Sequence, residues 1–116
     1  MKIYHIVLPE VWEKFKDEDF YEADSLAAEG FIHCSFTDQL EAVLERYYKS
    51  AEKVLILTVD AEKLTSKLIE EPSTNNEIYP HIYGQINRDA IAGIEEKEIN
   101  RDKKQFKNPL YPLHPC

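Results

Sequence analysis

Three of the four histidines in this chain lie in separate segments that have the composition of β-strands. They are His5, His33 and His81, and two of them are followed two residues later by a hydroxyl side chain, Ser35 or Tyr83. Alternation places each pair on one strand face. Imidazoles and hydroxyls together supply the donors and acceptors that a polar ligand needs. We therefore expect the segments GFIHCS and PHIYG to line one small-molecule pocket, although each histidine alone is equally typical of a half-buried sheet.

Glu71 is the candidate acidic group of this site. It ends a possible strand together with Glu70, directly before the polar loop PSTNNE. A carboxylate in that position binds a ribose hydroxyl or acts as a general base. The simpler alternative, favoured by the many acidic residues of the chain, is a solvated pair on the surface.

We expect no metal ion. Cys34 follows His33 directly, and adjacent strand residues point to opposite faces, so the two side chains do not converge. Neither a C-x-x-C nor an H-x-x-x-H spacing is present. Three histidines from different strands leave a metal site open as the weaker alternative. Cys34 is interpreted as a small core residue.

The elements that must position these groups follow from hydrophobic periodicity and turn chemistry. KIYHIVL is typical of a strand that ends where Pro9 begins a helix, and the alternation puts Ile3, His5 and Val7 on one face. Residues 37–49 repeat apolar side chains at helical spacing, and VLILTV reads as a buried central strand. The remaining predictions are an acidic loop at 16–24, a short helix at 25–30 and strands at 31–36, 67–71, 78–86 and 90–99.

Two glycines interrupt predicted strands. Gly93 suggests a bulge in the last strand, and Gly84 suggests either a sheet irregularity or a place where a ligand or another backbone comes close. Residues 101–116 contain three prolines and no periodicity, so we expect an extended tail. The chain is thus predicted to form one α+β domain over residues 1–100, followed by a Pro-rich tail.

Composition limits the possible partners. The 116 residues carry a formal net charge of -8, which opposes binding to the phosphate backbone of a nucleic acid. No apolar run is long enough to cross a bilayer, and the first residues do not resemble a signal peptide. Two cysteines do not make a disulfide framework. We expect a cytoplasmic protein with a small-molecule or nucleotide ligand, no nucleic-acid or membrane partner, and an oligomeric state that composition does not fix.

Taken together, several segments resemble the bacterial family called domain of unknown function 952. They are YHI at 4–6, Trp12, SLAAEGFIHCS at 25–35, Gln39, VLILTVD at 54–60, EPS at 71–73 and YPHIYG at 79–84. The resemblance runs from the N-terminus to about residue 96. Members of that family are similar in fold to ADP-ribosyltransferases, which hold NAD between two small antiparallel sheets, and to RNA 2′-phosphotransferases. The resemblance implies an α+β fold of split antiparallel sheets with short helices packed on them.

The same resemblance implies roles for the candidate residues. His5, His33 and Ser35 would hold the nicotinamide-ribose part of NAD, His81 and Tyr83 would complete the cleft as ligand-binding residues, and Glu71 would be the acidic residue. His33 and Glu71 are then the catalytic candidates. The motif is not the Arg-Ser-Glu or His-Tyr-Glu triad of the well-understood transferases, and Gln85 replaces a proline more usual in the family.

Three functions remain open on this reading. The first is an NAD- or nucleotide-handling enzyme, an ADP-ribosyl or 2′-phosphate transferase. The second is a module that binds or senses a small metabolite without turnover. The third works through partner surfaces, because Phe106, Leu110 and Tyr111 of the tail stand among prolines.

Overall fold

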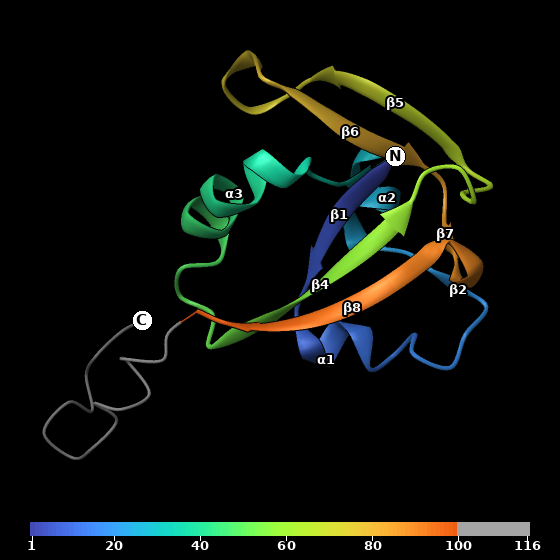
Figure 1. Cartoon of the computed structure of the whole chain (residues 1–116), viewed down its shortest axis with the longest axis horizontal. Helices are drawn as coiled ribbons and strands as arrows, with labels where there is room; N and C mark the ends of the chain where they lie inside the picture. The colour runs from blue at the N-terminus through green and yellow to red at the C-terminus, as the bar shows by residue number, and fades with distance from the viewer. Residues whose placement is uncertain (100–116) are drawn as a thin grey trace, which may run out of the picture.

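The computed structural model describes residues 1–99, and the predicted tail at 101–116 lies outside the described residues. The described chain is an α+β structure in which every strand pairing is antiparallel. Figure 1 shows a long curved sheet beside a projecting hairpin, together with short helices. The predicted fold class is confirmed at this level.

The main sheet contains β1 (Lys2–Val7), β4 (Lys53–Asp60) and β8 (Ile91–Glu98), in the order β1-β4-β8. The central position of β4 is confirmed, as expected for a strand that is apolar on both faces. The register between β4 and β8 shifts after the pair Thr58 and Gly93, so that Val59 faces Ile91. The predicted bulge at Gly93 is therefore present.

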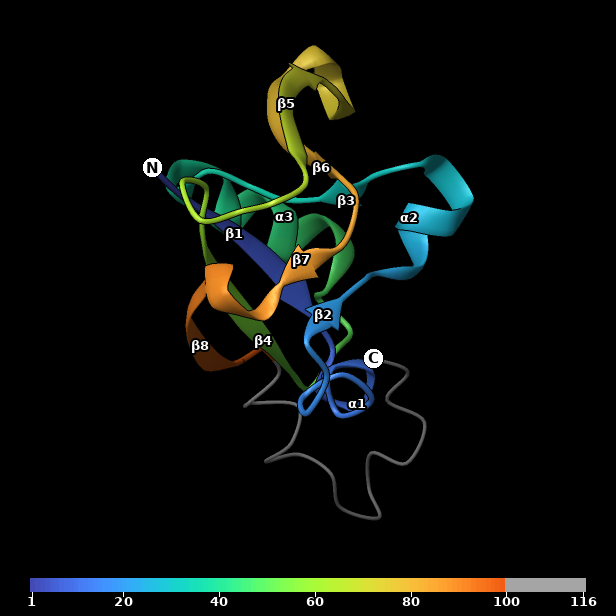
Figure 2. The same ribbon diagram turned by 90° about the vertical axis from the view of Figure 1, so that its right-hand side faces the viewer.

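Two smaller sheets cover one side of the main sheet. In one, β2 (Phe20–Tyr21) pairs with β7 (Ile86–Asn87). The other has the order β3-β6-β5, made of β3 (Ile32–His33), β6 (Ile78–Tyr83) and β5 (Lys67–Pro72). Figure 2 shows the β5–β6 hairpin extending beyond the rest of these sheets.

Two predicted strands are shorter than their composition suggested. The strand expected at 31–36 pairs with β6 only over two residues, because Ser35 then exchanges both backbone hydrogen bonds with Tyr4 of β1. The strand expected at 78–86 is divided between β6 and β7 by Gly84 and Gln85. In both cases the chain changes its pairing partner, which a local pattern does not encode.

The helices are short. They are α1 (Pro9–Trp12), α2 (Asp24–Glu29) and α3 (Leu40–Tyr47), with 3₁₀ turns η1 (Thr37–Gln39), η2 (Thr74–Asn76) and η3 (Arg88–Ala90). Gly30 ends α2 in the left-handed region at φ 93°, as its position predicted. The long predicted helix at 37–49 is real, but its first turn is 3₁₀. Within the described residues, no helix is long and apolar enough to span a membrane.

The core has two parts, one on each face of the main sheet. Ile3, Val7 and Leu57 face the smaller sheets and meet Ile82 and Ile86 there. On the other face Ile6, Val54 and Ile56 pack against Leu44 of α3, with Tyr4 at the edge of the cluster. The shared face predicted for Ile3, His5 and Val7 therefore faces the smaller sheets, and His5 is the polar member of it.

Candidate functional site

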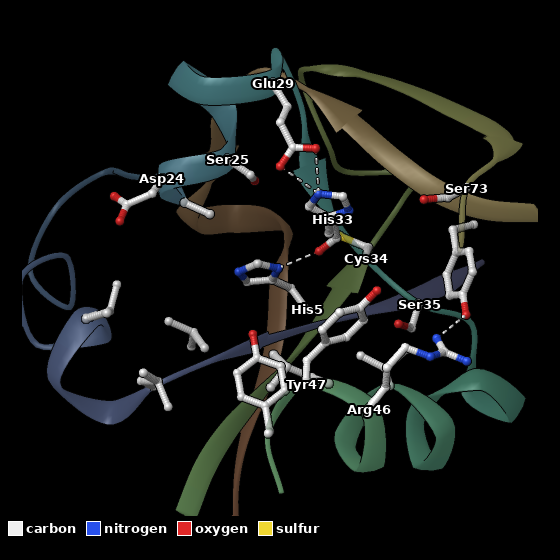
Figure 3. Close-up of a pocket in the computed structure, with 18 of the residues that line it drawn as sticks. His5, Asp24, Ser25, Glu29, His33, Cys34, Ser35, Arg46, Tyr47 and Ser73 are labelled. Carbon is white, nitrogen blue, oxygen red and sulfur yellow. Dashed lines mark hydrogen bonds and ion pairs between the residues drawn. The ribbon is translucent and has the colours of Figure 1, made fainter. Parts of the chain in front are cut away.

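A cavity of about 700 Å³ opens beside β1, one of the two edge strands of the main sheet. Its wall takes residues from β1, α2, β3 and α3, and from the turn that follows β5. Figure 3 shows His5, His33 and Ser35 on this wall, with Arg46 on the helix below them. Three of the sequence-predicted site residues therefore line one cavity.

His5 is buried on the cavity wall, and both of its ring nitrogens have protein partners. Nδ1 lies 2.7 Å from the backbone carbonyl oxygen of His33, and Nε2 lies 2.8 Å from the hydroxyl of Tyr21. The pKa of His5 is lowered from 6.5 to about 4, mainly by burial; the hydrogen bond to the carbonyl of His33 raises this pKa, and the electrostatic interaction with His33 contributes to lowering it. His5 is consequently neutral at physiological pH.

Tyr21 is a site residue that the sequence analysis missed. It was assigned to an acidic loop, but it lies in β2, is only 2 % exposed, and lines the cavity. Its ring packs against Trp12 and Phe15 at centroid distances of 5.8 and 5.2 Å. Burial raises the pKa of Tyr21. Its one sequence signal was an aromatic residue in an otherwise acidic stretch.

His33 is the exposed histidine of the cavity. Its Nε2 lies 3.2 Å from both carboxylate oxygens of Glu29, the last residue of α2. About half of each side chain is exposed. Ser35, predicted to share a face with His33, is buried on the cavity wall. Glu29 and His33 are both accessible to solvent. They are the ionisable side chains of the cavity wall that are best placed to contact a ligand.

Arg46 of α3 lines another part of the cavity. Its guanidinium lies over the ring of Tyr47 and donates a long hydrogen bond of 3.4 Å to the Tyr79 hydroxyl (Figure 3). The Tyr47 hydroxyl lies 3.0 Å from Oγ1 of Thr74, so α3 contacts the turn after β5 there. Arginine has five donors, so one bond to Tyr79 leaves most of them available.

Glu71, His81 and Tyr83 form a second cluster, which does not line this cavity although the ring of His81 contacts that of His33 at a centroid distance of 5.4 Å. The Glu71 carboxylate accepts hydrogen bonds from His81, at 2.7 Å, and from the Tyr83 hydroxyl. These two bonds, that of Tyr83 being the larger effect, lower the pKa of Glu71. The expected single pocket for GFIHCS and PHIYG is thus corrected: the first segment lines the cavity, and the second does not.

The ring of His81 is covered by Phe31. Register places His33 directly opposite His81. However, the ring of Phe31 stacks on that of His81 at a centroid distance of 4.0 Å, and His81 is 2 % exposed. Its Nε2 has no hydrogen-bond partner within the described residues. On the same face of β6, Tyr79 reaches the cavity in its place.

The structure also bears on metal and thiol chemistry. Across residues 1–99, no three His, Cys, Asp or Glu side chains gather in a way that would hold a metal ion. Cys34 is a free, buried thiol that packs in the core facing the smaller sheets. Burial raises the pKa of Cys34, which keeps it a thiol.

Comparisons with known proteins support the family and the fold. The crystal structure of protein CC0527 from Caulobacter crescentus is 25% identical to this chain, with a TM-score of 0.75, over 83% of this chain and 85% of that one. Its solution NMR structure is 24% identical, with a TM-score of 0.74, over 87% and 88% of the two chains. Among curated proteins, no significant match was found. A family model described as "Protein of unknown function (DUF952)" matches residues 6–94, and this chain belongs to that family.

Proposed function

We propose that the cavity binds a nucleotide of the NAD or ADP-ribose class. The observation that supports this proposal is the distribution of charge around the wall. Among the lining residues that the structure describes, Arg46 is the only lysine or arginine, whereas the carboxylates Asp24 and Glu29 both come from α2. Figure 3 shows Arg46 and the α2 residues on opposite sides of the hollow. A ligand with an anionic part and a hydroxyl-rich or cationic part matches that arrangement.

The size and aromatic content of the cavity fit the same ligand class. A volume of about 700 Å³ lies within the range of small-molecule and cofactor sites. Tyr47, Tyr48 and Tyr79 also line the cavity, and two of them, Tyr47 and Tyr79, contact Arg46. Tyrosine rings provide flat apolar surface for a base, and their hydroxyls add hydrogen bonds. Phosphate groups would then contact Arg46.

NAD is favoured over ADP-ribose by the α2 side of the cavity. The nicotinamide ring of NAD is cationic, and its ribose carries hydroxyl donors. Asp24 and Glu29 offer acceptors and negative charge to such a group. The ADP-ribosyltransferase-like placement inferred from sequence is compatible with this orientation for His5, His33 and Ser35.

Binding is tested by titrating the protein with NAD, ADP-ribose and a 2′-phosphorylated nucleotide while the histidine ring signals are followed by NMR. We expect saturable shifts of the His33 and His5 ring signals, with the lowest dissociation constant for NAD. Arg46→Gln should weaken binding about 10-fold or more, because it removes a charged partner of phosphate. Lys67→Gln, an exposed cation on β5 away from the cavity, is the matched control. Absence of shifts with all three nucleotides would refute the proposal.

Transferase activity is the second candidate, and the Glu29–His33 contact is the observation that favours it. A carboxylate held against a histidine in the cavity is placed to stabilise an oxocarbenium-like centre as the nicotinamide bond breaks. Glu71, the acidic residue chosen from sequence, is bound to His81 and Tyr83 instead. Nicotinamide release that is abolished by Glu29→Gln but retained by Glu71→Gln would support turnover. Saturable binding without release would leave a non-catalytic binding module.

A further inference from the structure

We propose that Tyr21 determines specificity by accepting a hydrogen bond from a donor group of the ligand, and that His5 acts on the ligand only through Tyr21. The ligand class in this inference rests on the proposed function. The arrangement of protons between the two side chains does not. It follows from the hydrogen bonds of three residues on the cavity wall.

The first step is the tautomer of His5. The backbone carbonyl of His33 has no hydrogen to donate, so the bond of 2.7 Å requires the proton on Nδ1 of His5. His5 is neutral, because burial opposes its charged form. A neutral imidazole carries one ring proton. Nε2 is therefore a lone-pair acceptor.

The second step is the hydroxyl of Tyr21. It lies 2.8 Å from Nε2 of His5, and an acceptor nitrogen requires that Tyr21 donate. The hydroxyl has one proton, and this bond uses it. The ring is held by Trp12 and Phe15, and the raised pKa of Tyr21 keeps the proton on the phenol. The tyrosine cannot reorient to donate elsewhere without leaving His5 unsatisfied.

The third step is the consequence for a ligand. Tyr21 lines the cavity, and its oxygen retains only acceptor capacity. A ligand hydroxyl, amide N–H or ammonium group can donate a hydrogen bond to that oxygen. A carboxylate or phosphate oxygen in the same place would bring two acceptors together with no proton between them. The wall near α2 adds acceptors from Asp24 and Glu29, so this side of the cavity selects donors.

His5 thus has a different role from the one that its position in the sequence suggested. Both ring nitrogens are occupied within the protein, so the ring has no free donor or acceptor for a ligand. It is a positioning residue that fixes the direction of the Tyr21 hydroxyl. Sites built to bond a specific polar group reject analogues that lack it, because their own buried groups are then left unpaired.

The proton arrangement is tested without any ligand by ¹⁵N NMR of the histidine ring. We expect His5 to carry its proton on Nδ1 and to remain neutral down to about pH 4. Tyr21→Phe should shift the Nε2 resonance of His5, since that nitrogen loses its donor. Tyr4→Phe, a tyrosine on the opposite face of β1, should leave it unchanged. A proton on Nε2 in the wild type would overturn the inference, whatever the ligand.

The role of Tyr21 in ligand binding is tested by measuring the affinities of NAD and three analogues. Two lack the 2′- or the 3′-hydroxyl of the nicotinamide ribose, and in the third a carboxylate replaces the carboxamide. We expect at least one analogue to bind the wild type about 10-fold more weakly than NAD, and this difference to disappear in Tyr21→Phe but persist in Tyr4→Phe. Equal binding of all four by the wild type, or discrimination retained by Tyr21→Phe, would overturn the inference and leave the proposed function intact. No binding of any of them by the wild type would refute the proposed function and this ligand class together.

Discussion

At the residue scale, the bond network of His5 couples the cavity wall to the stability of the fold. His33 contributes its backbone carbonyl to that network and its imidazole to solvent. The two histidines are thus adjacent but chemically different. His5 is a fixed neutral hydrogen-bonding group, and His33 is an accessible ring held by Glu29.

The lowered pKa of His5 predicts a loss of stability in mild acid. The unfolded chain takes up the proton near pH 6.5, whereas the folded chain resists it until about pH 4. The contribution is therefore fully present above pH 6.5 and decreases as the pH falls toward 4. Between pH 7 and pH 5 we expect the free energy of unfolding to fall by about 2 kcal/mol from this group.

Urea denaturation at the two pH values measures this effect. His5→Gln should lower stability at pH 7 and reduce the difference between pH 7 and pH 5 by about that amount. His33→Gln is the matched control, because it replaces a histidine whose side chain is about half exposed. A difference between the two pH values that His5→Gln leaves unchanged would show that His5 does not carry it.

At the element scale, Glu71 joins the two strands of the β5–β6 hairpin. It lies on β5 and accepts bonds from His81 and Tyr83 of β6. We expect Glu71→Gln to increase amide hydrogen exchange along both strands, since a charged acceptor is replaced by a neutral amide. Glu70→Gln, an exposed neighbour on the other face of β5, should have little effect.

Glu71 also makes the stability of the fold depend on pH, but for a different reason from His5. Hydrogen bonds favour the charged form of Glu71, whereas burial opposes the charged form of His5. The pKa of Glu71 is lowered, so its contribution to stability is present above the usual glutamate pKa of 4.5 and is lost as the pH falls through the folded value. In Glu71→Gln this acid-induced loss should be smaller than in the wild type. Thermal unfolding between pH 5 and pH 3 compares the two proteins. Identical slopes would show that Glu71 does not stabilise the hairpin through its charge.

Gly84 separates β6 from β7 because a neighbouring segment comes close. A Cβ at this position would lie 2.4 Å from Oγ and 2.8 Å from Cβ of Ser66, whose hydroxyl donates a hydrogen bond of 2.6 Å to the carbonyl oxygen of Gln85. Both readings that the sequence allowed are observed, because the strand is interrupted here and the Ser66 side chain comes close. Gly84→Ala should destabilise the protein by about 1–3 kcal/mol, as expected for overpacking.

A second substitution, at Ser66, should relieve this clash. Adding Ser66→Gly removes both atoms that the new Cβ would meet, so the double variant should recover part of the loss. Chemical denaturation of the wild type, the two single variants and the double variant gives the coupling free energy. Additive losses would show that the contact with Ser66 is not the cause.

At the scale of the whole molecule, the three sheets share one core. The cluster that contains Ile3 and Leu57 of the main sheet also contains Ile32 and Ile82 of the β3-β6-β5 sheet and Ile86 of β7. A second link joins η1 to the hairpin, because the Gln39 side chain donates to the backbone carbonyl of Ile78 and accepts from the backbone of Phe36. Figure 2 shows the hairpin on one side of this arrangement and α1 on the other.

Because the sheets share a core, the protein should unfold in one cooperative transition. Trp12, the single tryptophan, is buried in that core and reports on tertiary packing by fluorescence. We expect its denaturation curve to coincide with the curve from far-ultraviolet circular dichroism. Replacing buried Gln39 by Leu should shift both curves together, by about 2 kcal/mol or more, because two backbone groups lose their partner. Separate transitions would show that the small sheets unfold independently.

The sequence by itself determined the local elements and the faces of the main strands. The alternation in KIYHIVL placed Ile3, His5 and Val7 together, the apolar run VLILTV predicted the central strand, and Gly30 predicted the end of a helix. It also placed Cys34 in the core. These properties depend on residues close in the chain, whose periodicity is visible in one segment at a time. The family resemblance was confirmed over residues 6–94.

Only the tertiary structure decided which polar groups meet. Tyr21 reaches His5 because β2 is brought there by its pairing with β7, and the prediction of a loop around it was wrong. Phe31 stacks on His81, which does not line the cavity although it lies opposite His33 in register and contacts its ring. Strand pairing and ring packing join residues that are far apart in the chain, and they depend on long-range contacts that no single segment encodes. For this reason the sequence identified His5 and His33 but not Tyr21, the tyrosine that is hydrogen-bonded to His5.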